Sequence, residues 1–112
     1  METDILIVVS IIIVILVIRK LREKNGLYET YHSNGKLKEW GYWEKNVQVG
    51  TQKLFYENGQ VMLEQPWENG EVHGLTKIYH ENGKLFREEN YENGKMTSKK
   101  CWDKKGNETE CK

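Results

Sequence analysis

The chain has 112 residues, with 17 basic and 17 acidic side chains and a formal net charge of zero. That length leaves room for one small domain, which can bury only a limited core. The balanced charge argues against a nucleic-acid-binding protein, because such proteins usually carry a basic excess or a basic stripe.

The first 24 residues contain a dense apolar run. Residues 5–18 read ILIVVSIIIVILVI, in which Ser10 is the only polar side chain. As a helix this run would cover roughly 21 Å, against roughly 30 Å for the hydrocarbon core of a bilayer. Arg19 and Lys20 could lengthen it by snorkelling. We expect residues 1–24 to form one transmembrane anchor with a basic flank, which contacts the membrane through residues 5–18.

A cleaved signal peptide is the competing interpretation of this segment. Signal peptides open with positive charge and end in a small-residue cleavage site. Here Glu2 and Asp4 precede the run and no A-x-A-like triplet follows it, which favours an uncleaved anchor. The basic residues after the run place the following domain in the cytoplasm by the positive-inside rule. A disulfide between the two cysteines would place that domain outside the cytoplasm, so the orientation of this single-pass protein stays open.

Residues 25–112 repeat with a period of 24. Gly26, Gly50 and Gly74 keep this spacing, and aromatic residues keep it elsewhere in the unit. A fixed period of this length is typical of repeat arrays in which each unit packs on its neighbours. The predicted units are residues 26–49, 50–73 and 74–97, followed by a truncated capping unit at 98–112.

Each unit is predicted to contain two short strands around a tight turn. Asn-Gly pairs occur at residues 34–35, 58–59 and 82–83. A second series joins successive hairpins at 69–70 and 93–94, with Lys45-Asn46 at the matching place. Asn-Gly between alternating apolar residues favours a two-residue type I′ turn, because both central residues need positive φ. The expected fold is an all-β array of antiparallel hairpins in a single-layer sheet.

A two-residue turn also predicts which side chains share a face. It places Tyr31 opposite Lys38, Phe55 opposite Met62 and Tyr79 opposite Phe86. Together with Trp40 these residues form the candidate partner-binding face: Tyr31, Trp40, Phe55, Met62, Tyr79 and Phe86. Aromatic residues and Met are enriched in interface cores, although cross-strand stacking within the sheet also accounts for them.

The opposite face is the more continuously apolar one and is expected to pack. Its members are Thr30, Leu37, Leu54, Val61, Leu63, Ile78 and Leu85, with the column Trp43, Trp67 and Tyr91. A turn longer by one residue would shift the register and move half of these side chains to the other face.

Two local features interrupt the pattern. Pro66 falls late in a strand and must face an edge, a bulge or solvent, because proline has no N–H to donate. The last turn, around Gly106, is expected to be one residue longer than the others and to set Cys101 opposite Cys111. A disulfide there would contribute somewhat less than ~3 kcal/mol, and two free thiols are the alternative.

The chain presents no residue pattern typical of an active site. His32 and His80 occupy the same repeat position, which favours a structural role. The acidic residues before the Asn-Gly pairs recur in phase as turn flanks, and no glycine motif matches a phosphate loop. Two cysteines without a nearby histidine pair do not make a structural zinc site. We expect no catalytic residue, cofactor, metal or small-molecule substrate.

The unit G-x-x-K-x-Y/F-Y/H-E-N-G-K-L is plainest at residues 50–59 (GTQKLFYENG) and 74–85 (GLTKIYHENGKL). It resembles the bacterial MORN-repeat variant over about residues 26–107. Proteins of this type are similar to the group named YwqK-type toxin–antitoxin antitoxins. The resemblance implies a single-layer sheet of repeated hairpins and a binding rather than a catalytic role.

These observations together predict a membrane-anchored, non-catalytic protein-interaction module with antitoxin-like character. Its partner would be a protein that contacts one face of the sheet. The alternative is a structural or envelope protein that self-associates through its repeat array.

Overall fold

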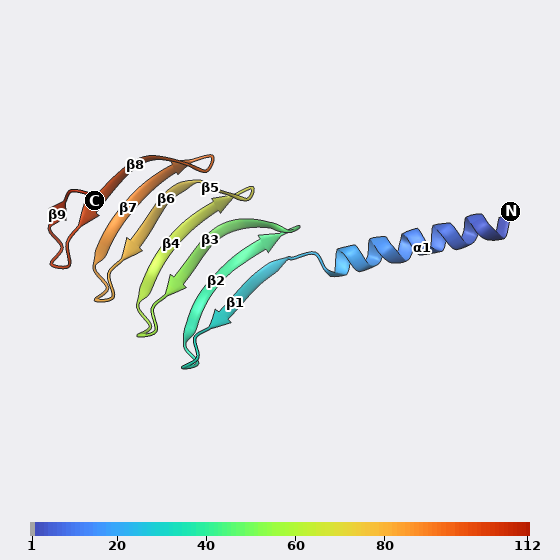
Figure 1. Ribbon diagram of the computed structural model, residues 1–112, viewed down its shortest axis with the longest axis horizontal. Helices are drawn as coiled ribbons and strands as arrows, with labels where there is room; N and C mark the ends of the chain where they lie inside the picture. The colour runs from blue at the N-terminus through green and yellow to red at the C-terminus, as the bar shows by residue number, and fades with distance from the viewer. Residues whose placement is uncertain (1) are drawn as a thin grey trace.

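A long N-terminal helix precedes the sheet in the computed structural model, which describes residues 2–112. Helix α1 spans Glu2–Leu21, and residues 22–25 join it to the first strand. Figure 1 shows α1 leading away from the sheet.

The prediction of a membrane anchor at residues 5–18, and with it a single-pass membrane protein, is wrong. Across residues 2–112, no helix is both long and apolar enough to cross a membrane. The apolar run rises only roughly 21 Å as a helix. Charged residues stand near both of its ends, Asp4 before it and Arg19 and Lys20 in the last turn of α1.

The rest of the described chain forms one antiparallel sheet. Its strands are β1 Gly26–Tyr31, β2 Leu37–Glu44, β3 Val47–Phe55, β4 Val61–Glu68, β5 Glu71–Val72, β6 Gly74–Tyr79, β7 Leu85–Glu92, β8 Lys95–Trp102 and β9 Glu108–Thr109. They lie in chain order across the sheet, with the short β5 paired to β4 (Figure 1). The predicted row of antiparallel hairpins is confirmed.

The second series of turns has the type I′ geometry. Both central residues have positive φ, at 48° and 67° in Lys45-Asn46, 51° and 82° in Asn69-Gly70, and 49° and 82° in Asn93-Gly94. The flanking glutamates, Glu44, Glu68 and Glu92, pair with the first residue after each turn. Asn and Gly tolerate the left-handed conformation that these two-residue turns require.

The first series of turns is longer than predicted. In the first unit the N–H of His32 donates to the carbonyl of Lys36 at 2.8 Å, and the N–H of Gly35 donates to the carbonyl of His32 at 3.0 Å. Residues 56–60 and 80–84 repeat both bonds. The positive φ belongs to the glycine, 84° at Gly35. These are three-residue loops with a glycine bulge, and the predicted type I′ turn at 34–35 is wrong.

The longer loops change the strand register. Tyr31 pairs with Leu37, Phe55 with Val61 and Tyr79 with Leu85, and not with the residues predicted. One step further along, Leu54 pairs with Leu63 and Ile78 with Arg87. Between these pairs, Lys38, Met62 and Phe86 are the extra residues of a β-bulge. A bulge residue is left without a partner in the ladder.

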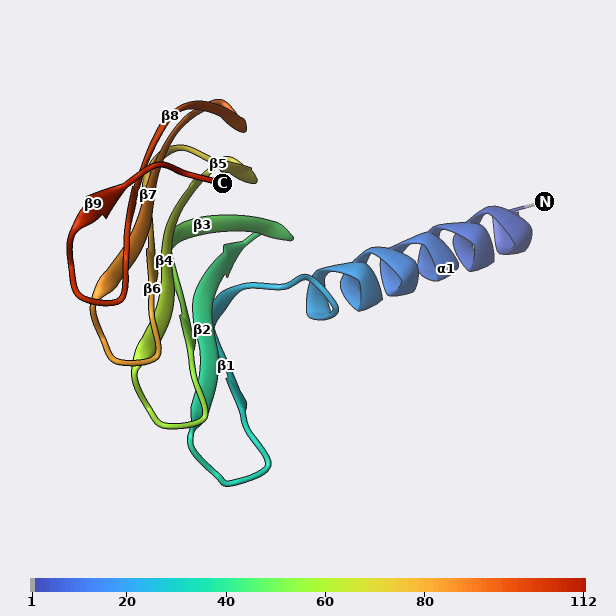
Figure 2. The same cartoon turned by 60° about the vertical axis from the view of Figure 1, so that its left-hand side comes forward.

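Glycines at the repeat period allow a wider bulge in the middle of the sheet. Trp40 pairs with Lys53 and Tyr42 with Val49, so Gly50 and the two residues after it face a single residue of β2. Gly50 has φ 71° and its counterpart Gly74 has φ 112°. Glycine adopts such values without the steric cost that a Cβ atom brings. Bulges bend a strand and increase its twist, and Figure 2 shows that the strands are curved.

Pro66 lies beside the interruption between β5 and β6. Its carbonyl accepts the N–H of His73 at 3.1 Å, and direct pairing of β4 with β6 stops at Glu64. Proline lacks an N–H, so this place in the ladder suits it. Pro66 was predicted to face an edge, a bulge or solvent, and the structure places it beside a bulge.

The last unit lacks the glycine that begins the two preceding units. Ser98 stands where Gly50 and Gly74 stand in the preceding units, and β8 has a one-residue bulge in place of the wide one. The final loop is not longer, because Asp103 and Gly106 repeat the two hydrogen bonds of the earlier loops. Backbone N–H donors, chiefly that of Asn107, hold the pKa of Asp103 below its usual value.

Successive units are joined by hydrogen bonds that recur along the array. The imidazole Nε2 of His32 lies 2.8 Å from the carbonyl of Phe55 and must donate, because a carbonyl only accepts. The hydroxyl of Tyr56 donates to Tyr79, and His80 contacts Trp102, at the corresponding carbonyls. Next to them, the amides of Asn34, Asn58 and Asn82 each donate at 3.0 Å to the next loop. These side chains dock each loop on the following one.

The sheet is a single layer, and its two faces differ. We define the inner face by the buried side chains of Thr76, Glu89 and Cys101. Figure 2 shows the chain end lying within the curve of the sheet. The disulfide between Cys111 and Cys101 joins the chain end to this face. Among the described residues, the most buried side chains are therefore polar ones and one disulfide, and no apolar second layer lies against the described sheet.

Candidate functional site

An apolar stripe crosses the other, outer face of the sheet near the three-residue loops. Directly opposed residues of neighbouring strands point to the same face, so Tyr31 and Leu37, Phe55 and Val61, and Tyr79 and Leu85 lie there as pairs. We define the outer stripe as these six residues together with Trp40. Leu37, Val61 and Leu85 were predicted on the packed face, and the longer loops move them to this one.

Polar side chains on the same face surround Trp40. It pairs with Glu29 on one side and Lys53 on the other. The Lys53 ammonium lies 5.7 Å from the indole ring and 3.6 Å from the carboxylate of Glu64. The hydroxyl of Tyr31 donates to Glu29. An aromatic centre with a charged border is the composition of many protein interfaces.

The structure does not bring the six predicted contact residues together. Tyr31, Trp40, Phe55 and Tyr79 share the outer face. Met62 and Phe86, as bulge residues, turn away from it. The ring of Phe86 lies 4.8 Å from that of His80, and both line a recess that also holds Cys101 and Cys111. Met62 lines a corresponding recess with His32 and Tyr56.

The outer stripe is only partly covered by its neighbours. Tyr31 is 58% exposed, whereas Trp40, Phe55 and Tyr79 are half-buried by adjacent side chains. Burial is the main reason that the pKa of Tyr79 is raised, and the nearby carboxylate of Glu64 adds to it. The stripe can accept an apolar surface, but it offers no nucleophile with an adjacent base.

A chain of polar contacts begins at the first unit on the inner face. The hydroxyl of Tyr28 donates to Glu39 at 2.8 Å and accepts from Gln48 at 3.0 Å. The amide of Gln52 donates to the same carboxylate oxygen at 2.6 Å, and its own oxygen accepts from Trp67 at 2.9 Å. Burial raises the pKa of Tyr28 to about 12, and Glu39 acts in the same direction.

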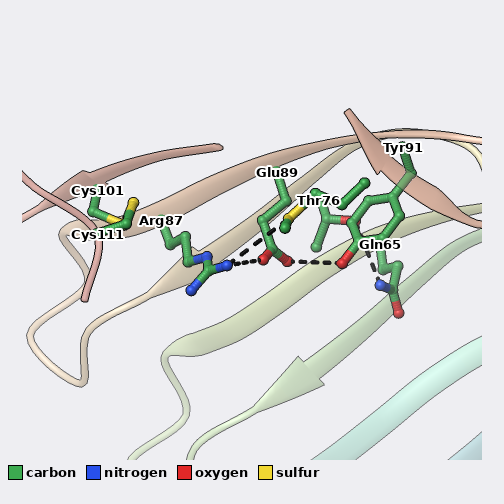
Figure 3. Close-up of polar contacts among 8 residues, drawn as sticks. Gln65, Thr76, Arg87, Glu89, Tyr91, Cys101 and Cys111 are labelled. Atoms are coloured by element: carbon green, nitrogen blue, oxygen red, sulfur yellow. Dashed lines mark hydrogen bonds and ion pairs between the residues drawn. A yellow bond between two sulfur atoms is a disulfide. The ribbon is translucent and has the colours of Figure 1, made fainter. Parts of the chain in front are cut away.

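A second polar cluster lies further along the inner face (Figure 3). The guanidinium of Arg87 contacts the carboxylate of Glu89 at 2.6 Å, and the hydroxyl of Tyr91 donates to the other oxygen at 3.2 Å. The pKa of Tyr91 is raised, and burial is the main cause. Gln65 donates to Thr76 at 3.4 Å. Glu89 is 8% exposed, so this ion pair serves the packing of the sheet.

Sequence reasoning did not find these inner-face contacts. Tyr28 and Glu39 stand at repeat positions that hold Gln52 and Leu63 one unit later. The signal in the sequence is that both residues depart from the repeat, at two positions on the same face of neighbouring strands. The repeat pattern consists of the residues that match between units, so it does not mark these two.

The two cysteines lie at the C-terminal end of the inner face. They form a disulfide with a Cα–Cα distance of 5.3 Å. Cys101 was predicted to lie directly opposite Cys111. In the structure it pairs with Thr109, two residues earlier in the chain. The chain leaves β9 and crosses back to reach Cys101, which is 4% exposed (Figure 3).

A model of the MORN repeat variant matches residues 24–44, 48–69 and 72–93, which together exceed half of the chain. The chain belongs to the MORN repeat variant family. The matched MORN segments cover most of the first three units, and the unit that carries Ser98 in place of glycine lies outside them. MORN repeats generally take part in protein or membrane interactions. The match does not show that the chain is bacterial, of the YwqK type or a member of an antitoxin group. Nothing among the curated proteins or the solved structures matches this MORN chain significantly.

Proposed function

We propose that this MORN-repeat chain is a non-catalytic protein-interaction module that binds a partner protein through the outer stripe. The observation that carries the proposal is the single-layer sheet. One face holds the buried polar clusters and the disulfide, while the aromatic stripe on the other face has no covering layer in the described chain.

The chemistry of the stripe supports an apolar protein surface as the partner. Tyr31, Phe55 and Tyr79 lie on every second strand of the sheet, and Trp40 lies on the strand between Tyr31 and Phe55. Tyr31, at the edge of the sheet, is 58% exposed. Lys53 and Glu64 beside Trp40 supply a polar border. Large aromatic residues are the side chains that most often dominate binding energy at interfaces.

The test uses Trp40→Ala and Phe55→Ala in the full chain. A partner captured by the wild-type chain is identified, purified and titrated against each variant. We expect each substitution to weaken binding at least tenfold, while far-ultraviolet circular dichroism keeps the sheet signal. Val47→Ala is the control, because Val47 is 37% exposed at the opposite end of a hairpin. Equal binding by all variants, or loss of folding in both, would sink the proposal.

A narrower form of the proposal makes this partner a toxin that the chain neutralises. It is supported only by the resemblance of the repeat unit to YwqK-type proteins. Co-expression with the captured partner tests it. The narrower form requires that the partner arrests growth alone and that the wild-type chain, but not Trp40→Ala, restores growth.

Self-association through the sheet edge is the second candidate function. Among residues 2–112, strand β1 pairs only with β2, whereas β3 pairs with both β2 and β4, and β6 pairs with both β4 and β7. An unpaired edge is a template for a strand of another copy. Sedimentation of the full chain over a range of concentrations tests this. Oligomers that dissociate in Leu27→Lys, which places charge at the exposed edge, would favour it over a separate partner.

A further inference from the structure

The first unit contains a recess on the inner face, away from the outer stripe. It has a volume of about 540 Å³ and lies between the linker after α1 and strands β1 and β2. Its walls are made mainly by Glu23, Lys24, Leu27, Tyr28, Glu39 and Trp43. Two aromatic rings and two carboxylates therefore surround one space.

The aromatic walls are held in place by the fold. The rings of Tyr28 and Trp43 lie 6.0 Å apart at an angle of 49°. Tyr28 lies over Gly41, where a Cβ atom would come within 2.7 Å of its ring. The hydroxyl of Tyr28 is fixed by Glu39 and Gln48. Glycine at residue 41 thus makes room for the ring that closes one side of the recess.

This recess is specific to the first unit. Tyr28 is replaced by Gln52 and Thr76 in the later units, Glu39 by Leu63 and Arg87, and Lys24 by Gln48 and Val72. Only the Trp43 position stays aromatic, as Trp67 and Tyr91. In the second unit the indole N–H of Trp67 instead donates to Gln52 at 2.9 Å. The repeat fold therefore does not require the combination found around Trp43.

A cation already occupies the aromatic wall. The ammonium of Lys24 lies 4.7 Å from the centre of the Trp43 ring. Ammonium and guanidinium groups are attracted to the faces of aromatic rings at such distances. Both hydrogen bonds to Glu39 go to Oε1. Within residues 2–112 no donor is assigned to its Oε2, so this oxygen is available to attract a cationic ligand.

We propose that this recess is a binding site for an ammonium or guanidinium group, and that Lys24 fills it when no ligand is present. Trp43 and Tyr28 supply the aromatic walls, and Glu39 and Glu23 supply negative charge. The ligand is either the side chain of a basic residue of another protein or a small free cation. The backbone of Lys24, and not its side chain, makes the hydrogen bonds to Asn46, so its ammonium can leave without unfolding the strand.

Titration of the full chain followed by nuclear magnetic resonance tests the site. The probes are tetramethylammonium, with tert-butanol as its neutral counterpart, and lysine capped at both backbone ends, with the Nε-acetylated form as its counterpart. The readout is the indole N–H signal of Trp43, assigned among the four tryptophans by its absence from Trp43→Leu. We expect a saturable shift with a cationic probe and none with its neutral counterpart. Binding of tetramethylammonium alone would assign a small free cation, and binding of the capped lysine alone would assign a basic side chain.

Removing the internal cation gives the sharper test. Lys24→Gln should tighten binding of the cationic probe roughly two- to fivefold, because the probe no longer competes with Lys24. Glu39→Gln should weaken it, while Lys38→Gln, an exposed lysine outside the recess, should leave it unchanged. The proposal fails if neither the wild type nor Lys24→Gln shows a saturable shift, or if Lys38→Gln tightens binding equally. Trp40 lies outside this recess, so Trp40→Ala should leave binding of the cationic probe unchanged. Failure of the cation-site proposal can therefore be told apart from failure of the proposal that a partner binds the outer stripe.

Discussion

At the scale of single residues, the first unit differs most from the repeat at Tyr28. Its ring lies over Gly41 and its hydroxyl joins Glu39, Gln48 and, at 3.4 Å, Gln52. The later units have shorter polar side chains at this position. Tyr28 therefore links β1, β2 and β3 on the inner face, and its hydroxyl is the shared point of that contact.

Tyr28→Phe tests this linking role. It keeps the ring but removes the donor to Glu39 and the acceptor for Gln48, which leaves two half-buried polar groups without this partner. We expect the free energy of unfolding to fall by about 1–2 kcal/mol, measured by urea denaturation. Tyr31→Phe is the matched control, because its hydroxyl reaches an exposed carboxylate; a loss as large as that of Tyr28→Phe would contradict the assignment.

The raised pKa of Tyr28 predicts a dependence of stability on pH. Burial favours the neutral phenol and raises its pKa from 10.0 to about 12 in the folded chain. The stabilisation linked to this shift is fully present below pH 10, and it is lost as pH rises through the folded pKa. Between these values the unfolding free energy should fall more steeply for the wild type than for Tyr28→Phe. Parallel curves in urea denaturation across this range would show that Tyr28 titrates normally.

At the scale of elements, glycine decides where a strand can bend. Gly50 has positive φ inside β3, and the bulge around it interrupts pairing with β2. Ser98, at the corresponding place in the last unit, accompanies a smaller bulge. The same repeat thus gives a wide bulge with glycine and a narrow one without it.

Gly50→Ala should be destabilising through the backbone alone. An added Cβ would meet the Tyr42 ring at 3.6 Å, which is an ordinary contact distance. The left-handed conformation costs a non-glycine residue about 1–2 kcal/mol. Gly50→Asn should lose less, since asparagine tolerates this region better. Thermal and urea denaturation of both variants measure the difference; an unchanged Gly50→Ala would show that φ at this residue is not a requirement.

At the scale of the whole molecule, the two ends of the repeat array differ in how their terminal strands are covered. Within the described part of the chain, β1 has no partner on the side away from β2, whereas the chain after β9 folds back to form the disulfide. Units of such an array stabilise one another mainly through neighbours. A change at the C-terminal end should therefore affect the last strands most and the first unit least.

Cys111→Ser tests this local dependence. Removing a link between residues separated by 10 positions should cost about 2–3 kcal/mol. We expect amide hydrogen exchange to become faster in β8 and β9, while β1 to β3 keep their protection. Reduction of the wild-type chain is the matched comparison and should give the same pattern. Loss of protection across the whole sheet would contradict a locally stabilised array.

The amino-acid sequence by itself determined the period, the position of every hairpin and the single-layer antiparallel sheet, because turn residues and apolar alternation are local signals. The type of the first turn series was decided only in the tertiary structure, where a one-residue difference in loop length set the register. That register placed Leu37, Val61 and Leu85 on the outer face and took Met62 and Phe86 from it. The contacts of Tyr28 with Glu39 and Gln52 also depend on strands distant in sequence. Face and site membership follow from register across strands, which no single segment specifies.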